Sequence, residues 1–371
     1  MTSRHILIMG ASYGSLLGAK FLLAGHNIKL VCQLPEVKLI NAEGFRVRLP
    51  VRTQAQPVVL DSRKLPGQAF ALVPADVKPG DFDLVVLAMQ EPQYGSPAVS
   101  ELLDGIARAR VPCLSIMNMP PPPYLKRIRA INYASVASAY VNPRVWDKFD
   151  PTLLTMCSAD PQAIRPPNSK SNVLEVTLPT NFKVARFDHA PSSGILRQLE
   201  QDIDSARLET PDGPIELPVK LRVHDSFYVP LAKWPMLLTG NYRCLAEDNV
   251  VDIKDAVLHN IEESRSAYNF VMDVCLEVGA NAEDLVAFEK YAAAANSLTR
   301  PSSAARALMN GATNIERADK LVQLVARQMG MSHPVIDATV ARVDSWLEAN
   351  RLRPSEVTHR VEGSGRPTNF C

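Results

Sequence analysis

The sequence lacks several features that would assign it to a specialised class of protein. No apolar stretch approaches the roughly 20 residues of a membrane-spanning helix, and the apolar run near the start is broken by Gly10. We therefore expect that run to be a strand rather than part of a secretory signal. Neither sign of charge dominates, because 40 Lys and Arg are balanced by 39 Asp and Glu. This balance gives no electrostatic case for nucleic acid or an anionic membrane as a partner.

The six cysteines are scattered and form no C-x-x-C motif or paired spacing. Such spacing argues against a metal site or a disulfide framework and fits the reducing cytoplasm, where we expect the protein to reside. With 371 residues, 46% of them hydrophobic and 21% charged, the chain has an ordinary globular composition and the length of two domains. The 29 prolines concentrate between the two apparent domains.

The clearest positive pattern is the segment from His5 to Val31, which predicts a strand, a glycine turn, a helix and a second strand. An apolar run leads to Gly10, a helical pattern opens at Gly14, and Gly25-His26 ends it before the next apolar run. This βαβ order is typical of nucleotide-binding α/β folds.

Glycines suit a phosphate-binding turn because they leave backbone N–H groups unshielded at the positive end of a helix dipole. The usual pattern is G-x-G-x-x-G, whereas here Ser12 stands in place of the second glycine and the loop is one residue short. Gly18, one turn after Gly14, is expected to let the helix pack closely on the strand. The alternative is a strand–helix turn without a ligand. The predicted dinucleotide-binding loop consists of Gly10, Ala11, Ser12, Tyr13, Gly14 and Ser15.

The end of the second strand indicates which dinucleotide binds. An acidic residue there would hold the ribose of NAD and repel the extra phosphate of NADP. Here the strand is followed by Gln33, the first carboxylate is Glu36, and the basic residues Lys38, Arg46 and Arg48 come later. The missing acid favours NADP, with Gln33 as a predicted contact. Alternatively, the basic residues are only solvated surface.

Two further apolar runs predict strands of a parallel sheet. One covers 84–88 and is followed by Gln90, and the other runs over 111–117 and is followed by Asn118. Ligands of open α/β sheets bind at the carboxyl ends of strands, so Gln90 and Asn118 are placed to contact the cofactor. For Asn118 the alternative is a turn-forming role before the prolines that follow.

The rest of the chain divides into two regions of different periodicity. Residues 45–75 are expected to extend the sheet, and residues 150–220 to add its last strands and a hairpin that turns at Asp212-Gly213. From about residue 229 the period becomes 3.6, which predicts a long helix over 257–279 and another over 315–329.

The predicted fold class is therefore a Rossmann-type doubly wound α/β sheet followed by an all-α C-terminal domain. Isolated helices are also predicted over 98–108 and 195–203 within the first domain. The expected domains are a dinucleotide-binding domain over 1–220, with an extended region over 150–220, a helical substrate and dimerisation domain over 221–352, and a flexible tail over 353–371.

This organisation resembles the ketopantoate reductase (2-dehydropantoate 2-reductase) family. HILIMGASYGSLLGAKFLLAGHNIKLV is similar to the family's opening unit, and SIMN, which ends at Asn118, is similar to its asparagine motif. Ala232-Lys233 and Asn241-Tyr242-Arg243-Cys244-Leu245 resemble the helix that begins its second domain. The segments 301–303 and 311–316, with Gly330 and Pro334, resemble its Ser-Ser, Thr-Glu-Ile and Gly-x-x-x-Pro succession. The resemblance covers most of the chain.

The resemblance implies hydride transfer from NADPH to the ketone of a 2-keto acid. Lys233 would then be the general acid that protonates the developing alkoxide, held by Asn118. A lysine in so apolar a run is costly unless it contacts a cavity or partner, which favours this role over that of a surface lysine at a helix start. The substrate-binding residues implied are Asn241, Ser302, Ser303, Asn314 and Glu316.

Three departures from the family pattern fall in the implied substrate pocket. Gln90 stands where the family has a lysine, Leu237 where it has a second asparagine, and Asn314 where it has a glutamate, although Glu316 is two residues on and could substitute. Each departure removes a group that would hold a small hydroxylated keto acid, so we expect an altered substrate. A bulkier or less polar carbonyl compound would then contact Leu237, Trp234 and Met236.

Two other functions remain open from the sequence. An opine-type dehydrogenase would act on an imine through a His–Asp pair, for which the best candidate is His224-Asp225, although adjacent side chains on a strand point apart. A non-catalytic NADP-binding regulator is the other alternative, which the short loop and the lost polar groups favour. The expected partners are a small carbonyl substrate and a second copy bound through the helical domain, with no metal.

Overall fold

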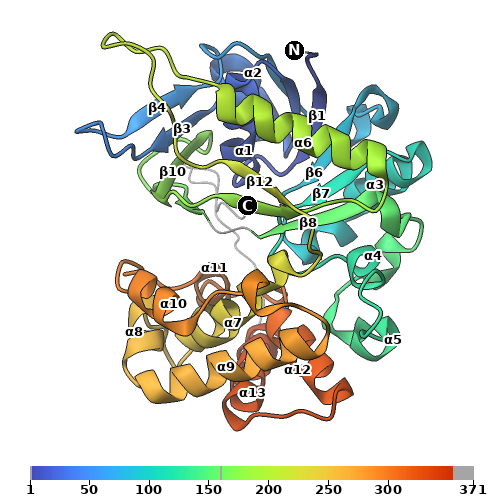
Figure 1. The fold of residues 1–371 in the computed structure, drawn as a ribbon, viewed down its shortest axis with the longest axis vertical. Coiled ribbons are helices and arrows are strands. Elements are labelled where there is room, and N and C mark those ends of the chain that lie inside the picture. The colour runs from blue at the N-terminus through green and yellow to red at the C-terminus, as the bar shows by residue number, and fades with distance from the viewer. Residues whose placement is uncertain (1, 159–160, 354–371) are drawn as a thin grey trace.

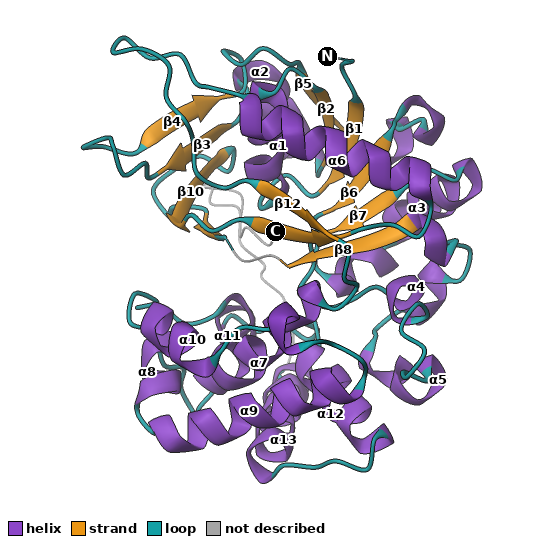
Figure 2. Ribbon diagram, viewed as in Figure 1, coloured by secondary structure: helices purple, strands orange, loops and turns teal. Residues whose placement is uncertain are grey.

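The computed structural model of the chain describes residues 2–158 and 161–353. A sheet with helices on both faces forms the upper part of the molecule in Figure 1, and helices form the lower part. Figure 2 shows the same division, with the strands gathered above and helices and loops below. The predicted fold class, a Rossmann-type doubly wound sheet followed by an all-α region, is confirmed for the described residues.

Within the described chain, eight strands form a main sheet in the order β12-β11-β8-β7-β6-β1-β2-β5, and four form a second sheet in the order β4-β3-β10-β9. Neighbours in the main sheet are parallel except β8 and β11. The carboxyl ends of β1, β2, β6 and β7 therefore share one edge, where ligands of such sheets bind. The strands are β1 (His5–Met9), β2 (Asn27–Val31), β3 (Arg46–Leu49), β4 (Val58–Asp61), β5 (Ala69–Leu72), β6 (Leu84–Leu87), β7 (Cys113–Ser115), β8 (Leu154–Ser158), β9 (Gln162–Ile164), β10 (Val173–Leu178), β11 (Phe182–Ala185) and β12 (Leu221–His224).

Helices α1 and α6 cover one face of the main sheet, and α3 covers the other. Helices α7 to α13 build the helical region. The α-helices are α1 (Gly14–Leu23), α2 (Leu34–Glu43), α3 (Pro97–Ala109), α4 (Pro122–Leu125), α5 (Tyr133–Val136), α6 (Ala190–Ser205), α7 (Lys233–Met236), α8 (Ile253–Leu258), α9 (Ile261–Glu277), α10 (Phe288–Ala295), α11 (Ser303–Met309), α12 (Ala318–Gln328) and α13 (Pro334–Leu352).

Strand β1 shows why its sequence is apolar at consecutive positions. Successive side chains of a strand point to opposite faces of the sheet. Ile6 and Ile8 belong to the core that lies under α1 and α6, whereas Leu7 and Met9 belong to the core shared with α3 and the helical region. All four are fully buried. Because both faces are covered, no position on the strand is left for a polar residue.

Most of the predicted elements are present. The opening βαβ unit consists of β1, α1 and β2, and β6 and β7 match the two later apolar runs. Helices α3 and α6 match those predicted over 98–108 and 195–203. Helix α12 ends before Gly330, and Pro334 begins α13, as the sequence predicts.

The prediction that residues 45–75 extend the main sheet is wrong in part. Only β5 joins it, whereas β3 and β4 form the second sheet together with β9 and β10 from the 150–220 region. Val47 of β3 lies opposite Leu60 of β4 and Leu174 of β10, and all three are buried. A short strand shows in its sequence which face it buries but not which distant strand it pairs with.

The prediction of one long helix over 257–279 is wrong in part. Helix α9 ends at Glu277, just before Gly279 as predicted, but the helix is interrupted between α8 and α9, and Val257 belongs to α8. Asn260 has φ −129° and ψ 88°, outside the helical range, and its side-chain oxygen accepts a hydrogen bond from the backbone N–H of Glu263. Asparagine competes for backbone groups in this way and favours a helix start over a helix interior. The apolar stripe continues across the break because both helices pack on the same core.

The sheet continues past the domain boundary expected at residue 220, because β12 pairs with β11 up to His224. We therefore propose a boundary after His224. Asp212-Gly213 lies between Leu208 and Ile215, which pair across the predicted turn. Helix α13 ends at Leu352, and the tail predicted over 353–371 lies, apart from Arg353, outside the described residues.

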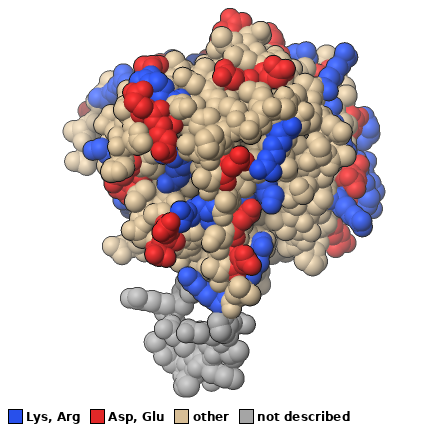
Figure 3. Space-filling view, turned by 90° about the horizontal axis from the view of Figure 1, so that it is seen from below, with Lys and Arg blue, Asp and Glu red and all other residues tan. Residues whose placement is uncertain are grey.

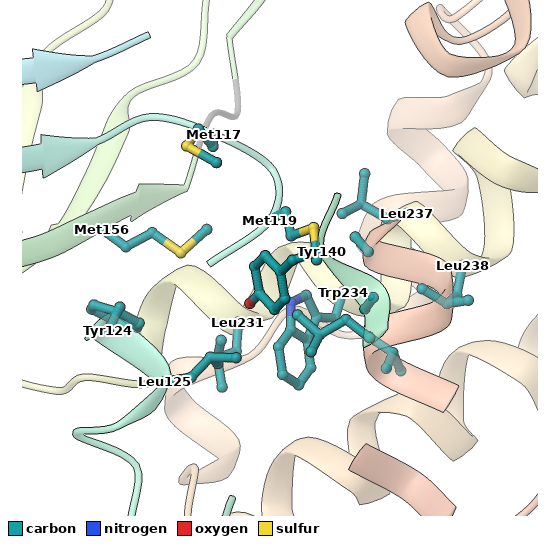
Figure 4. Close-up of a cluster of buried hydrophobic side chains, with 14 of the residues drawn as sticks. Met117, Met119, Tyr124, Leu125, Tyr140, Met156, Leu231, Trp234, Leu237 and Leu238 are labelled. Atoms are coloured by element: carbon teal, nitrogen blue, oxygen red, sulfur yellow. The ribbon is translucent and has the colours of Figure 1, made fainter. Parts of the chain in front are cut away.

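The two regions meet through a buried apolar cluster (Figure 4). Met117, Met119 and Met156 come from the sheet region, and Trp234 and Leu238 come from the start of the helical region. These five residues belong to one continuous core, each less than 4% exposed. Because an apolar interface favours association, we expect the sheet and the helical region to form one unit at equilibrium.

Basic and acidic side chains are interspersed over the face drawn in Figure 3. None of the helices in the described residues combines the length and the apolar composition that a membrane span requires.

Candidate functional site

The glycine loop lies at the carboxyl end of β1, pressed against the end of β6. Gly10 has φ +111°, and a Cβ there would lie 2.8 Å from the carbonyl oxygen of Ala88. A Cβ on Gly14 would lie 2.5 Å from Cγ2 of Ile8, so neither position has room for a side chain. At Gly18 a Cβ would come within 2.9 Å of an Ile28 side-chain methyl. The predicted close packing of helix on strand is therefore confirmed at Gly18.

The polar side chains of the loop are turned toward the protein. The buried hydroxyl of Ser15 donates a hydrogen bond to the carbonyl of Ala11, and the Tyr13 hydroxyl donates to the carbonyl of Pro161 at 2.6 Å. Ser12 is only partly exposed. The first N–H groups of a helix have no acceptor in a preceding helical turn, but those of Ser15 and Leu16 here donate to the carbonyl oxygens of Ser12 and Tyr13, at 3.1 Å and 3.2 Å. A pyrophosphate at this loop would therefore depend on the amides that precede Ser15, where Ser12 replaces the usual second glycine.

The carboxyl end of β2 carries no free acid. Gln33 is exposed and precedes α2, while Glu36 on the first turn of α2 is buried and paired with Arg165. Arg46 and Arg48 lie on β3, where each has a carboxylate oxygen at 3.5 Å. These two arginines belong to the second sheet rather than to the end of β2, so they do not supply the cation expected for NADP.

A small cavity lies between the sheet region and the helical region. Its volume of about 10 Å³ has room for about one water molecule. Five of the predicted site residues meet at its wall, namely Gln90 after β6, Asn118 after β7, Asn241, Ser303 and Glu316. Its other lining residues are Leu237, Tyr242, Ala304 and Ile315. The wall at Gln90 is continuous with the glycine loop, because Met89 and Ala88 lie against Gly10.

The carboxyl group of Glu316 is the buried ionisable group of this cavity. One oxygen accepts a hydrogen bond from the backbone N–H of Glu91 at 3.2 Å, and the other accepts from the Asn118 side chain at 3.4 Å. Burial raises the pKa of Glu316 to about 7, which the nearby Glu91 carboxyl also favours. A carboxyl group with this pKa exchanges its proton near neutral pH, which suits proton transfer.

Glu91 holds the neighbouring backbone in place. Its carboxylate accepts hydrogen bonds from the backbone N–H groups of Val141 and Asn142, at 3.1 Å and 3.4 Å. The residue is 1% exposed, and burial raises its pKa despite these two bonds. Glu91 therefore fixes the turn that follows Gln90 and presents its own N–H to Glu316.

A π-helical turn, η8 (Leu237–Asn241), carries two of the lining residues. Such turns are rare and occur often at functional sites. Tyr242 follows it, and its hydroxyl donates to the backbone carbonyl of Glu316 at 2.6 Å while accepting from the N–H of Ala318 at 3.0 Å. This pair of bonds fixes the backbone that presents the Glu316 carboxyl to the cavity.

Lys233 begins α7 and is buried. It precedes Leu237 by four residues, and Leu237 precedes Asn241 by four, a spacing that puts all three on one side of the helical segment. Leu237 and Asn241 line the cavity, whereas Lys233 is one turn further back and is not part of the wall.

No protein-family model matches the chain, and no curated protein matches it in sequence. Solved structures do match. The 2-dehydropantoate 2-reductase from Methylococcus capsulatus has a TM-score of 0.61 at 13% identity, over 95% of this chain and 98% of that one. The dimeric ketopantoate reductase from Staphylococcus aureus has a TM-score of 0.59 at 12% identity, over 93% and 99%. A D-mandelate dehydrogenase in a ternary structure with NADH and anilino(oxo)acetate has a TM-score of 0.63 at 13% identity, over 94% and 100%.

The fold is that of the ketopantoate reductases. At these identities the likeness establishes the fold alone, and the roles of individual residues depend on the geometry described above. The chain shares nearly the whole length of the matched structures, so the ketopantoate reductase fold includes both the sheet region and the helical region.

Within this ketopantoate reductase fold, several predicted residues lie outside the cavity. Asn314 is exposed, and its side chain accepts a hydrogen bond from Arg351 at 3.3 Å. Ser302 is buried as the N-cap of α11, accepting from the N–H of Ala305 and donating to the carbonyl of Asn241. Ser302 therefore supports the wall at Asn241 rather than forming it. Of the two residues, Glu316 lines the cavity and Asn314 does not.

Of the three apolar side chains expected to contact the substrate, only one lines the cavity. Leu237 lines the cavity, whereas Trp234 is fully buried in the interdomain cluster, beside Tyr140 in Figure 4. Met236 packs against the same core and is not part of the wall. The sequence shows that this run is apolar but not which side of the helix meets the cavity.

Sequence reasoning missed Glu91 and the role of Tyr242. A glutamate directly after a predicted site residue is a weak signal, because most glutamates at such positions are solvated. Both residues act through contacts with Glu316, which lies far away in the chain. No pattern within their own segments marks such contacts.

Proposed function

We propose that this chain is an NADPH-dependent reductase that transfers hydride to the carbonyl of a 2-keto acid or a related small carbonyl compound. The observation that carries the proposal is the meeting of Gln90, Asn118, Asn241, Ser303 and Glu316 at one cavity beside the glycine loop. The likeness of the fold to ketopantoate reductases and to a D-mandelate dehydrogenase supports the same reaction class.

The cofactor is held, in this proposal, by residues at the carboxyl edge of the sheet. The backbone of the Gly10–Ser15 loop binds the pyrophosphate, Gln33 contacts the ribose, and Gln90 and Asn118 lie beside the nicotinamide. When bound, NADPH supplies the hydride that reduces the carbonyl carbon.

The proton comes from the chain itself. Lys233 lies one turn behind the cavity wall, so in this proposal it reaches the substrate once the walls have moved apart. It then donates the proton to the oxygen of the reduced carbonyl, because an ammonium stabilises the developing negative charge and carries a proton to give. Asn118 orients the carbonyl, and Glu316 accepts a hydrogen bond from the substrate and exchanges protons with the site near neutral pH. Asn241 and Ser303 bind the carboxylate or a hydroxyl group of the substrate.

The lining favours a 2-keto acid with an apolar side chain over a small hydroxylated one. Leu237 and Ile315 contribute apolar surface, and Leu237 stands where a second polar group would hold a hydroxyl. The D-mandelate dehydrogenase structure holds anilino(oxo)acetate, an aromatic 2-oxo acid. A cavity of about 10 Å³ is smaller than any keto acid, so binding requires its walls to move apart.

The test is a panel of 2-keto acids assayed by the loss of NADPH absorbance, preceded by fluorescence titration with NADPH and NADH. We expect Lys233→Ala to lower kcat by about 10² to 10⁴-fold. Lys254→Ala is the matched control, because Lys254 is an exposed lysine in the same region. Equal turnover by wild type and Lys233→Ala would refute the role of Lys233. If the protein binds the cofactor but reduces no carbonyl compound, the result would favour the alternative of a non-catalytic NADP-binding regulator.

The opine-type alternative receives no support from the geometry of its best candidate pair. Asp225 directly follows β12, the edge strand of the main sheet, and is exposed and paired with Arg197 at 2.9 Å. His224 therefore has no carboxylate from Asp225 to orient it. An assay with 2-keto acids in the presence of amino acids would reveal imine reduction directly.

A homodimer through the helical region and a cytoplasmic location belong to the same proposal. The ketopantoate reductase from Staphylococcus aureus is described as dimeric, and Ile261 and Leu276 of α9 are 40% exposed apolar residues here. The thiols of Cys113, Cys244 and Cys275 are buried in the core and form no disulfide, which suits a reducing compartment. Light scattering after size exclusion would measure the oligomeric state.

A further inference from the structure

The segment 161–178 forms an arm that lies along α2. It consists of β9, a connecting loop and β10, which pairs with β3 in the second sheet. At its start, Pro161 accepts the hydrogen bond from Tyr13 of the glycine loop. At its far end, Lys170 pairs with Glu43 at 2.5 Å, at the last turn of α2. The arm therefore connects the cofactor loop to both ends of the helix that follows β2.

Arg165 places a guanidinium of this arm beside the first turn of α2. It pairs with Glu36, three residues after Gln33. The Arg165 side chain is 17% exposed, and no described residue offers an acceptor to its buried Nε. Glu36 engages Nη2, whereas a guanidinium carries five N–H donors in a planar fork. The Arg165 guanidinium therefore has N–H groups that Glu36 does not engage, close to where the ribose of a dinucleotide lies in such folds.

The other basic residues after β2 do not reach this place. Arg46 and Arg48 are held on β3 by carboxylates at 3.5 Å, and Gln33 is neutral. Lys38 is exposed one turn further along α2. Arg165 is the guanidinium that the described structure brings against the start of α2.

We propose that Arg165 recognises the 2′-phosphate of NADPH, with Glu36 as the residue that positions its guanidinium. The inference rests on the proposed function and deepens it, because it identifies the residue that makes the enzyme prefer NADPH over NADH. A planar guanidinium suits this role because two of its N–H groups match two phosphate oxygens. The cation comes from an arm that lies far from the βαβ unit in sequence, which explains why the end of β2 carries none.

The test compares binding of NADPH and NADH to the full-length protein by fluorescence titration. Arg165→Gln is expected to raise the Kd for NADPH by about 10- to 100-fold, the cost of a charged hydrogen-bonded contact, and to change the Kd for NADH less than about threefold. Arg165→Lys should recover part of the NADPH affinity. Glu36→Gln should reduce the preference for NADPH by a smaller factor, because it frees the guanidinium rather than removing it.

Lys170→Gln is the matched control, because Lys170 holds the same arm to the other end of α2. We expect it to leave the ratio of the two dissociation constants unchanged. In steady-state kinetics, Arg165→Gln should raise KM for NADPH with little change in kcat.

Three results would overturn the inference. If Arg165→Gln weakens the binding of NADPH and of NADH equally, Arg165 does not recognise the 2′-phosphate and the arm only covers the site. If the wild type binds NADH as tightly as NADPH, the reductase proposal survives and the role of Arg165 does not. If the wild type binds neither nucleotide, the proposed function itself fails, and the inference fails with it.

Discussion

The cofactor loop and the cavity are assembled from the chain in different ways. The loop is one continuous stretch from Gly10 to Ser15, shaped by backbone conformation and by the absence of a side chain at Gly10 and Gly14. The cavity wall comes from five separate segments, and its properties come from buried polar side chains such as Glu316. A change in the loop therefore acts through backbone crowding, whereas a change in the cavity acts through charge and hydrogen bonding.

The largest effect is expected at the loop, for Gly10→Ala. A Cβ there meets the carbonyl of Ala88 at 2.8 Å, and φ is +111°. Strain and crowding together should cost about 4 kcal/mol of unfolding free energy and greatly weaken NADPH binding. Urea denaturation and fluorescence titration measure the two effects. Gly213→Ala is the control, because φ is +105° there but no atom lies within 4 Å. An equal loss of stability in both variants would mean that crowding at Ala88 is unimportant.

In the cavity, Glu316→Gln should change stability in the opposite direction. Burial raises the pKa of Glu316 to about 7, above the ordinary 4.5. The stability linked to this proton is present below pH 4.5 and is lost as the pH rises through 7. Without the titrating group, the variant should be more stable than the wild type at pH 8 by up to about 3 kcal/mol, with little difference at pH 4.5.

Urea midpoints at the two pH values measure this effect. Glu283→Gln, at an exposed position in the helical region, provides the control and should show no such dependence. The same Glu316→Gln protein should lose most of its reductase activity. A variant that is less stable than the wild type at pH 8 would contradict the assignment of a buried carboxyl group with a raised pKa.

A smaller effect is expected for Leu237→Asn, which restores a polar group to the cavity wall. A hydrogen bond to a substrate hydroxyl should raise kcat/KM for ketopantoate about tenfold relative to phenylglyoxylate. The ratio of the two kcat/KM values is the measurement. Leu237→Ala makes space without adding a polar group, so it serves as the control. A change of the same size in both variants would show that size, not polarity, sets the preference.

The smallest effect is expected at His26, which follows the end of α1 that is remote from the loop. It is fully buried, with Nε2 3.4 Å from a carboxylate oxygen of Asp202, and Nδ1 accepts a hydrogen bond from the N–H of Arg4. Burial lowers the pKa of His26, which Asp202 only partly offsets. Stability linked to the neutral ring is therefore present above pH 6.5 and lost as the pH falls below it.

His26→Asn should reduce this acid-side loss, as measured by the urea midpoint at pH 8 and pH 5. The pH dependence at His26 thus has the opposite sign from that at Glu316. Because His26 and Glu316 lie in different parts of the molecule, the changes in unfolding free energy should be additive in a double variant. A pH dependence of the same sign in the two single variants would contradict the assignment of a buried neutral ring at His26 and of a buried carboxyl group with a raised pKa at Glu316.

The sequence by itself determined the features that depend on neighbouring residues. The glycine loop, α1 and the buried strands β1 and β6 follow from continuous apolar runs and from glycines in a tight turn. Gln90 and Asn118 could be assigned to one site because the carboxyl ends of parallel strands share an edge of the sheet.

Only the tertiary structure decided which distant segments meet. It paired β3 with β10, brought Glu316 rather than Asn314 to the cavity, and set Arg165 against α2. The reason is physical: burial, pairing and pKa depend on what packs against a side chain, and a local pattern carries no record of partners more than a hundred residues away.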